Sequence, residues 1–227
     1  MSDQTGLSMD SFSFVDTPTS EVEAAEQRYG AFTDDVRRLL DLTIRSTVDE
    51  DRMTRAQALI REAADLLAEE VSPGPAGVRY NGEGRSWNWG NAVIGVRNAV
   101  APPVALQWGD DGSVSAEVTL GAAYEGPPGQ VHGGVSAMLL DHLMGETASA
   151  AHTRLTVTGT LTLRYVRPLP LGPVQMQAHT SAEEGRKVTV TAHIGNDDGP
   201  AVEATGLFII PSWAYDFDAE TGIGSLD

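Results

Sequence analysis

The chain has 227 residues, of which 41% are hydrophobic and 21% charged, the composition of a folded protein with one generous domain and an appendage. Its net charge of −17 argues against nucleic acid or an anionic membrane as a partner. Cysteine is absent, which excludes disulfides, a thiol nucleophile and thiolate metal sites. With no bilayer-length apolar run and no secretory-signal pattern at its start, the sequence predicts a cytoplasmic location.

The N-terminal third is the most acidic part. Residues 1–75 hold 16 acidic and 7 basic residues, roughly twice the acidity per residue of the remainder. Residues 1–19 are rich in Ser, Thr, Asp and Gly, and we predict a disordered lead-in there. A DNA-reading role for this third is improbable because of its charge.

Two helices are predicted in an N-terminal extension at residues 20–75. The first is expected from Thr33 and the second from about Asp49 to Val71, because each carries an apolar stripe at helical spacing. Two prolines at 73 and 75 then end the second helix. We expect a helical hairpin packed against the main domain, with a separate functional module as the alternative.

Residues 76–212 are predicted to form the main domain, followed by a tail at 213–227. Residues 76–101 show no clear pattern. Beyond them, apolar and polar residues alternate as in strands, in the segments 114–120, 157–165, 174–178, 188–194 and 202–210. A helix is predicted at about 134–151, between these strands. It carries apolar residues on nearly all of its faces, so it should be buried. The sequence thus predicts an α+β fold in which an antiparallel sheet wraps one helix.

The segment that carries chemistry joins a Gly- and Pro-rich loop to this helix. Gly133 and Gly134 would let a substrate approach the free N–H groups at the helix start, where negative charge on a carbonyl oxygen is stabilised. Asp141 follows within the greasy helix, and an unpaired buried carboxylate needs a partner, water or a function. A solvent-facing or purely structural Asp141 is the alternative.

The chain resembles the hotdog-fold thioesterases, particularly the PaaI-like and THEM4-like acyl-CoA hydrolases. The resemblance covers about residues 100–211. It is carried by the Pro-Gly-x-Val-His-Gly-Gly loop at 128–134, by Asp141 nine residues after the histidine, and by Thr158 seven residues before Tyr165. It implies the hotdog fold, with acyl-CoA as the substrate and no cofactor, since coenzyme A is part of the substrate.

The resemblance also implies roles for single residues. Asp141 would activate water as a general base, or act as the nucleophile. Thr158, from the other subunit of a homodimer or tetramer, would position that water. Backbone N–H groups of Gly133 and Gly134 would polarise the thioester carbonyl, and His132 would shape the loop. Some PaaI-like members carry an asparagine six residues before this histidine, where this chain has a glycine.

Further residues are expected to contact the substrate. Val131 and Met138 lie in the loop and on the helix. The scarce positive charges of the catalytic half are Arg167, Arg186 and Lys187, and these are candidates for the phosphates of coenzyme A. Ordinary surface charge is an equally good explanation for each of them. The histidines show no metal-ligand spacing, so no metal is expected.

Two other functions are alternatives. A catalytically silent hotdog module could bind acyl-CoA or serve in assembly. A hotdog hydratase or dehydratase is disfavoured, because its aspartate–histidine pairing in a different helix is missing here. Neither acyl chain length nor the choice between coenzyme A and carrier-protein thioesters follows from the sequence.

Overall fold

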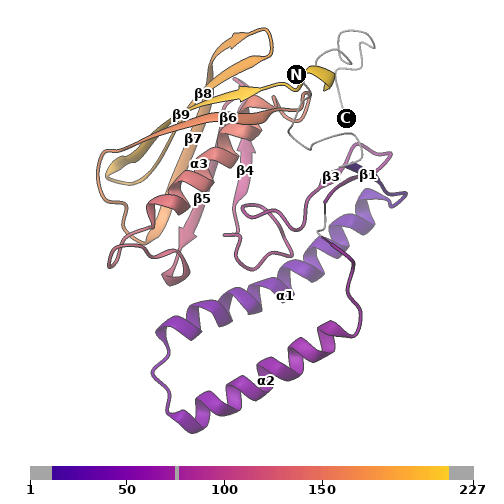
Figure 1. The fold of residues 1–227 in the computed structure, drawn as a ribbon, viewed down its shortest axis with the longest axis vertical. Coiled ribbons are helices and arrows are strands. Elements are labelled where there is room, and N and C mark those ends of the chain that lie inside the picture. Colours follow the sequence, from indigo (N-terminus) through magenta and orange to yellow (C-terminus); the bar gives the residue numbers. More distant parts are fainter. Residues whose placement is uncertain (1–11, 75–76, 215–227) are drawn as a thin grey trace.

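The computed structural model describes residues 12–74 and 77–214 (Figure 1). Two sheets and three helices form the described chain. The N-terminal part contains β1 (Phe12–Phe14), α1 (Thr19–Arg45), α2 (Glu50–Ala68), β2 (Val78–Tyr80) and β3 (Ser86–Trp87). The remainder contains β4 (Ala105–Trp108), β5 (Val114–Leu120), a short 3₁₀ helix (Ala122–Tyr124), α3 (Gly133–Ala148), β6 (Val157–Tyr165), β7 (Gly172–Glu184), β8 (Lys187–Asn196) and β9 (Gly199–Ile209).

A six-stranded antiparallel sheet, in the order β4-β5-β7-β8-β9-β6, curls around α3 (Figure 1). The alternation in the sequence explains which face is inside, since successive strand residues point to opposite faces. In β5, for example, Val114, Ala116, Val118 and Leu120 are buried while the residues between them are not. The predicted α+β hotdog fold and its strands are therefore confirmed.

The helix α3 is the centre of the core. Leu139, Leu140, Leu143 and Met144 are each at most 1% exposed. Burying such side chains stabilises a fold by about 1.5–3 kcal/mol each. The prediction of a buried central helix is confirmed, with bounds one residue earlier at the start and three residues shorter at the end.

Within residues 12–74 and 77–214 the sheet ends at β6, which pairs there with β9 on one side only. Six of its nine residues are exposed, so its other edge presents unpaired backbone N–H and C=O groups. An exposed edge of this length is a surface on which another strand can pair.

The extension differs from expectation at its beginning. Phe12–Phe14 is a strand, paired in parallel with Val78–Tyr80, where we predicted an unstructured lead-in. The first helix starts at Thr19 rather than Thr33. Its first half has few apolar residues but many strong helix formers (Glu, Ala and Gln), so propensity rather than a stripe marks it. The predictions for residues 1–11 and for the tail beyond 214 lie outside the described residues.

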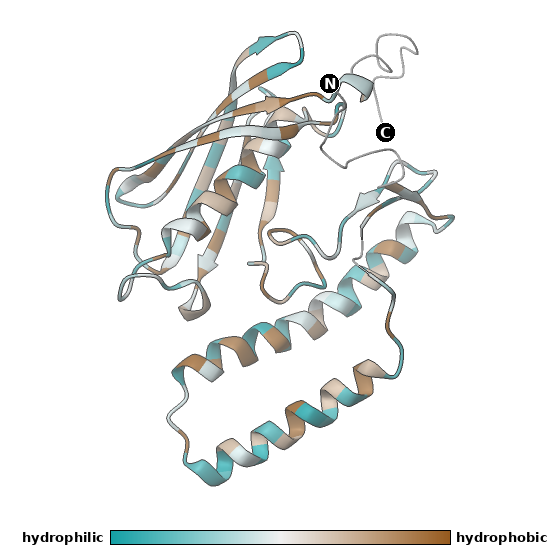
Figure 2. Ribbon diagram, in the orientation of Figure 1, coloured by the Kyte–Doolittle hydropathy of each residue, from teal (hydrophilic) through white to brown (hydrophobic). Residues whose placement is uncertain are grey.

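The second helix has nearly the predicted bounds, and Asp49 caps it by accepting a hydrogen bond from the Arg52 N–H. Its packing, however, was predicted wrongly. No residue of α2 is buried. Figure 2 shows hydrophobic bands on α2 alternating with hydrophilic ones, while the helix stands apart from the main domain.

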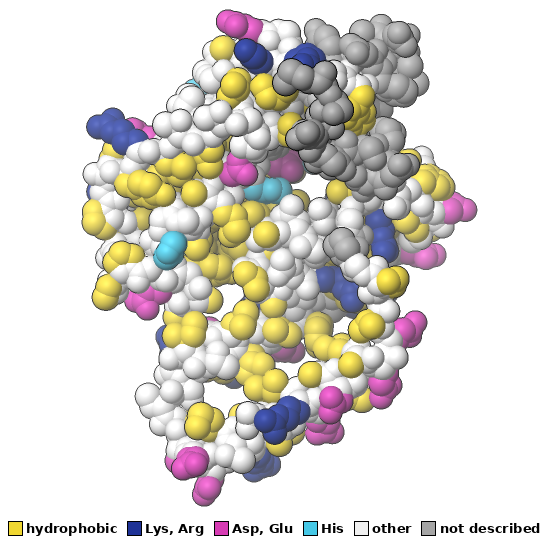
Figure 3. All heavy atoms as spheres, viewed as in Figure 1, with side chains coloured by type: hydrophobic (Ala, Val, Ile, Leu, Met, Phe, Trp, Pro, Cys, Tyr) yellow, Lys and Arg dark blue, Asp and Glu magenta, His cyan; other side chains and the backbone are white. Residues whose placement is uncertain are grey.

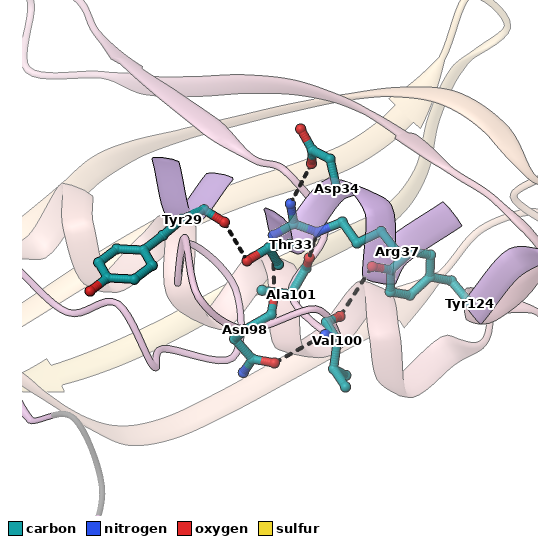
Figure 4. Close-up of polar contacts among 8 residues, drawn as sticks. All are labelled: Tyr29, Thr33, Asp34, Arg37, Asn98, Val100, Ala101 and Tyr124. Atoms are coloured by element: carbon teal, nitrogen blue, oxygen red, sulfur yellow. Dashed lines mark hydrogen bonds and ion pairs between the residues drawn. The ribbon is translucent and has the colours of Figure 1, made fainter. Parts of the chain in front are cut away.

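The helix α1, by contrast, is anchored to the main domain through Arg37 (Figure 4). The Arg37 guanidinium donates to the carbonyl oxygens of Ala101 (3.0 Å) and Asn98 (3.2 Å) and pairs with Asp34 at 2.7 Å. Close by, the Tyr124 hydroxyl donates to the Val100 carbonyl at 3.1 Å. Hydrogen bonds from Arg37 therefore attach the extension, together with ring packing of Tyr29 on Trp89 at 5.1 Å between centroids.

Candidate active site

A cavity of about 760 Å³ lies between α3 and the N-terminal sheet. Asp141, Gly145 and Glu146 of α3 form one wall. Aromatic side chains of the N-terminal part and the following loop form another, namely Phe12, Phe14, Tyr80, Trp87 and Trp89. Among the described residues of 20–75, whose relation to the site the sequence left open, only Glu26 lines this cavity, and the aromatic wall comes from the segments that flank them.

The two polar residues singled out for catalysis meet in this cavity. The Thr158 hydroxyl donates to Asp141 Oδ1 at 2.9 Å. Asp141 is half-buried and Thr158 is exposed on the cavity side. Both belong to the same chain, which corrects the expectation that the threonine comes from a second subunit. The carboxylate therefore has a hydrogen-bond partner and still faces open space.

The direction of Thr158 was also predicted wrongly, and a β-bulge is the reason. Alternation along the strand predicts its side chain on the polar face, with Thr156, Thr160 and Thr162 and away from Leu161 and Leu163. The pairing of β6 with β9 shifts between Thr158 and Thr160, leaving Gly159 as the extra residue. Thr158 lies opposite Phe208, whose side chain is buried in the core, so the two point to the same face. The bulge turns the hydroxyl inward to α3, an action typical of bulges beside functional sites.

The start of α3 is organised by His132. This residue caps the helix, and its Nδ1 accepts from the Gly134 N–H at 3.0 Å. The Gly134 N–H is therefore occupied, which corrects its assignment as a donor to substrate in this conformation. Gly133 is the first residue of α3, so its N–H has no acceptor within the helix, and nothing else among the described residues accepts from it. The Gly133 carbonyl accepts from the Tyr165 hydroxyl at 2.9 Å. Of the two N–H groups expected to bind the carbonyl oxygen at the start of α3, only that of Gly133 is therefore free.

The loop before α3 explains the glycine found in place of an asparagine. A Cβ at Gly126 would lie 2.7 Å from the His132 Cα, closer than real contacts allow. The loop is tightened further by Glu125, which accepts from the Gly129 N–H at 2.7 Å. A side chain at position 126 would displace His132, so the role of that asparagine is not filled from here.

Within one chain the predicted base, Asp141, and the predicted N–H donor, Gly133, are far apart. Gly133 and Asp141 are eight residues apart on α3, about 12 Å along the helix axis. The cavity lining includes Asp141 and Thr158 but neither His132 nor the glycines. A single chain therefore does not bring the carboxylate and the free N–H to one reacting atom.

Most of the predicted substrate contacts also lie elsewhere. Val131 is buried in the core, and Met138 packs against that core. Arg167 uses its guanidinium on its own chain, bonding Asn196 Oδ1 at 2.5 Å and the carbonyls of Gly199 and Pro200, which speaks against a phosphate role. Arg186 and Lys187 are exposed beside the β7–β8 hairpin, away from the cavity wall, and their role stays a prediction.

A polar cluster that the sequence did not reveal lies deeper along α3. Glu146 Oε1 lies 3.7 Å from His142 Nε2, and Glu146 Oε2 lies 3.3 Å from His152 Nε2. Neither His142 Nε2 nor Glu146 Oε2 has a well-directed hydrogen bond among the described residues, and both atoms are buried. Burial lowers the pKa of His142 below its ordinary 6.5, and the carboxylates of Glu146 and Asp141 offset this only in part.

His152 reaches this cluster from an unusual turn. Ala150, Ala151 and His152 have φ angles of 49°, 56° and 66°, three consecutive non-glycine residues in the left-handed region. Such residues cost roughly 1–2 kcal/mol each. Nothing in the sequence Ala-Ala-His signals this backbone. The turn brings an imidazole to the cavity wall, next to Arg154, which pairs with Glu183 at 2.8 Å.

The described part of the chain was searched for a metal site and for a membrane-spanning helix. In residues 12–74 and 77–214 no group of three His, Asp or Glu side chains could hold a metal ion. Over the same residues, no helix combines the length and apolarity needed to cross a bilayer.

Comparison with known proteins agrees with the fold. Residues 128–203 match the family model of the thioesterase superfamily. The chain is 40% identical over 93 residues to acyl-coenzyme A thioesterase THEM4 of Xenopus laevis, and 33% identical over 92 residues to that of Bos taurus. These matches cover 39% of the chain and 41% and 37% of the two relatives, so the chain spans about two fifths of their length.

A solved structure described as a thioesterase superfamily protein is similar over a longer stretch. It is 34% identical, with a TM-score of 0.71, over 80% of this chain and 94% of the other. Residues 77–227 make up only about two thirds of the chain, so the likeness extends into the N-terminal third. With this coverage, and the hotdog fold around α3, the chain belongs to the thioesterase superfamily.

Proposed function

We propose that the protein hydrolyses acyl-CoA thioesters to the free carboxylic acid and coenzyme A. The observation that carries the proposal is the hydrogen bond between Thr158 and Asp141 at the wall of a cavity large enough for an acyl group. The names of the relatives supply the thioester class, and the cavity supplies a place for the acyl chain.

In the proposed reaction Asp141 removes a proton from a water molecule held beside it, and that water attacks the thioester carbonyl carbon. Thr158 fixes the carboxylate so that one oxygen stays free to take the proton. The tetrahedral intermediate carries its negative charge on the former carbonyl oxygen, near a backbone N–H at a helix start. Collapse breaks the carbon–sulfur bond, and the coenzyme A thiolate takes up a proton. A thiolate leaves readily, so no stronger nucleophile is needed.

The N–H donor is proposed to come from a second copy of the chain. Gly133 is the donor with a free N–H, yet it lies about 12 Å along α3 from Asp141 in its own chain. The unpaired edge of β6 carries Thr158 and ends at Tyr165, whose hydroxyl holds the Gly133 carbonyl. Pairing of two β6 edges would bring one chain's helix start towards the other's cavity, giving two composite sites per dimer.

A catalytically silent module that binds acyl-CoA is the competing function.

Substituting Asp141→Asn removes the base but keeps the shape of the side chain, so turnover should fall by about 10²-fold or more. Thr158→Val should cost less, and Thr158→Ser should restore most of the loss because it restores the hydroxyl. The measurement is thiol release from a panel of acyl-CoAs, with circular dichroism confirming folding. Undiminished Asp141→Asn activity would contradict the role of Asp141. No turnover by the unaltered protein, with tight binding, would favour the module.

A further inference from the structure

The charges of the cavity that holds Asp141 suit an acyl group better than the phosphates of coenzyme A. Three carboxylates line it, those of Glu26, Asp141 and Glu146. Its two guanidiniums are already paired, Arg85 with Glu26 at 2.9 Å and Arg154 with Glu183 at 2.8 Å. Neither guanidinium is therefore left for a phosphate, and the carboxylates would repel one, whereas an uncharged acyl chain meets no such repulsion.

The same cavity leaves large apolar side chains uncovered. Phe14 is 57% exposed and Trp108 is 46% exposed, and both belong to its lining. Figure 3 shows hydrophobic side chains in the middle of this face, between the main domain and the N-terminal elements, with histidine and acidic side chains beside them. A bound apolar group would remove this surface from water. The acyl chain is the group that fits, because the proposed base, Asp141, lines the same space.

Two tryptophans separate this cavity from a second hollow. The second hollow measures about 440 Å³ and is lined by Val22, Ala25 and Arg28 of α1 and by Arg79 of β2. Trp87 and Trp89 belong to the lining of both spaces. Their indole rings therefore form a partition between the two.

Packing and hydrogen bonds hold this partition in place. Trp87 is only 7% exposed, and its ring centroid lies 5.9 Å from that of Trp89, which in turn lies 5.1 Å from that of Tyr29. The Trp89 Nε1–H donates to Glu26 Oε1 at 3.1 Å, and Arg85 binds the same carboxylate. Because the rings are held on several sides, the partition is a fixed end of the cavity rather than a moving gate.

We propose that Trp87 and Trp89 end the acyl-binding cavity and thereby set the longest acyl chain that the protein hydrolyses. The inference rests on the proposed hydrolysis of acyl-CoA, and it narrows the substrate class to acyl-CoAs of limited chain length. The determinant lies outside residues 128–203, the stretch that matches the family model. Removal of the Trp87 indole would open the cavity of about 760 Å³ into the hollow of about 440 Å³, so longer chains would fit.

The first test compares hydrolysis of saturated acyl-CoAs, from butanoyl to hexadecanoyl and below their micelle concentrations, by Trp87→Ala and by the unaltered protein. In Trp87→Ala the ratio of kcat/KM for the longest chain to that for the shortest should rise at least about tenfold. Trp213→Ala removes an indole outside the described lining of the cavity and should leave the ratio unchanged. Circular dichroism reports folding. An unchanged ratio in folded Trp87→Ala would overturn the proposal.

A second test detects the contact itself and depends neither on turnover nor on tolerance of the alanine. Bromine on an acyl chain quenches the fluorescence of a tryptophan that it contacts. The probe is an acyl-CoA with bromine on its terminal carbons, in the longest chain length that binds to Asp141→Asn protein. It should quench the emission of this protein, and adding Trp87→Phe should remove at least half of the quenching, whereas adding Trp213→Phe should not.

The outcomes separate this proposal from the proposed function. Equal quenching in the two double variants, or no quenching at any chain length, would overturn the assignment of Trp87 to the end of the acyl cavity. Quenching that depends on Trp87, without hydrolysis by the unaltered protein, would support the acyl cavity and contradict the proposed hydrolysis alone.

Discussion

Two helices of similar length, α3 and α2, both carry many apolar residues, yet α3 lies in the core and α2 lies in solvent. The sheet curls around α3, and the three leucines of this helix are at most 1% exposed. The helix α2 bears one apolar stripe and buries none of it within the chain. The difference shows that an apolar pattern predicts a helix and a face to be covered, whereas the covering element depends on the rest of the chain or on another chain.

The largest expected difference between these helices is in stability. Leu140→Ala empties a site that is 0% exposed, so the free energy of unfolding should fall by about 2–5 kcal/mol. Leu66→Ala on α2, where the side chain is 62% exposed, should change it by about 0.5 kcal/mol or less. Urea denaturation at low protein concentration measures both. Equal losses would mean that α2 is packed against its own chain.

The junction between the two regions offers an intermediate effect. Arg37→Met removes two part-buried hydrogen bonds to main-chain carbonyls, which should destabilise the attachment of α1 by about 1–3 kcal/mol. Arg38→Met, at an exposed position of the same helix, is the matched control. Hydrogen exchange should show faster exchange across α1 for Arg37→Met alone, with β5, β7 and β8 unchanged. Uniformly faster exchange would show that the two regions unfold as one unit.

The smallest expected effect concerns pH. Burial lowers the pKa of His142, so the folded protein keeps this imidazole neutral where the unfolded chain binds a proton. Stability should therefore decline as pH falls from about 6.5 towards the lowered pKa, by roughly 1.4 kcal/mol per unit of difference. His142→Gln should flatten this decline, and His179→Gln, at an exposed position, should not. Parallel curves for all three proteins would contradict it.

Much of the hotdog half follows from local pattern. The alternation in 114–120 and 187–209 and the all-round apolarity of α3 lead directly to the observed elements. The position of Asp141 beside a cavity is consistent with the reasoning that a carboxylate in a greasy helix needs a partner.

What the sequence did not reveal depends on tertiary contacts. The strand Phe12–Phe14 is defined by a partner more than sixty residues away. The bulge at Gly159 shifts the register of β6 against β9, so the Thr158 side chain points to the opposite face of the sheet. Strict alternation of side chains along a strand does not predict such a shift. The aromatic wall of the cavity joins segments separated by the whole of α1 and α2.

Mixing two inactive variants tests most directly whether the site is shared between chains. Asp141→Asn lacks the base. Gly133→Pro lacks the N–H but suits the first helical position, because His132 before it has extended backbone angles. Gly133→Ala, which keeps the N–H, is the control. After chains are exchanged, half the dimers are mixed and each has one intact site, so about a quarter of the unaltered activity should return. No recovery despite verified exchange would show that Asp141 acts with groups of its own chain and would contradict the composite site.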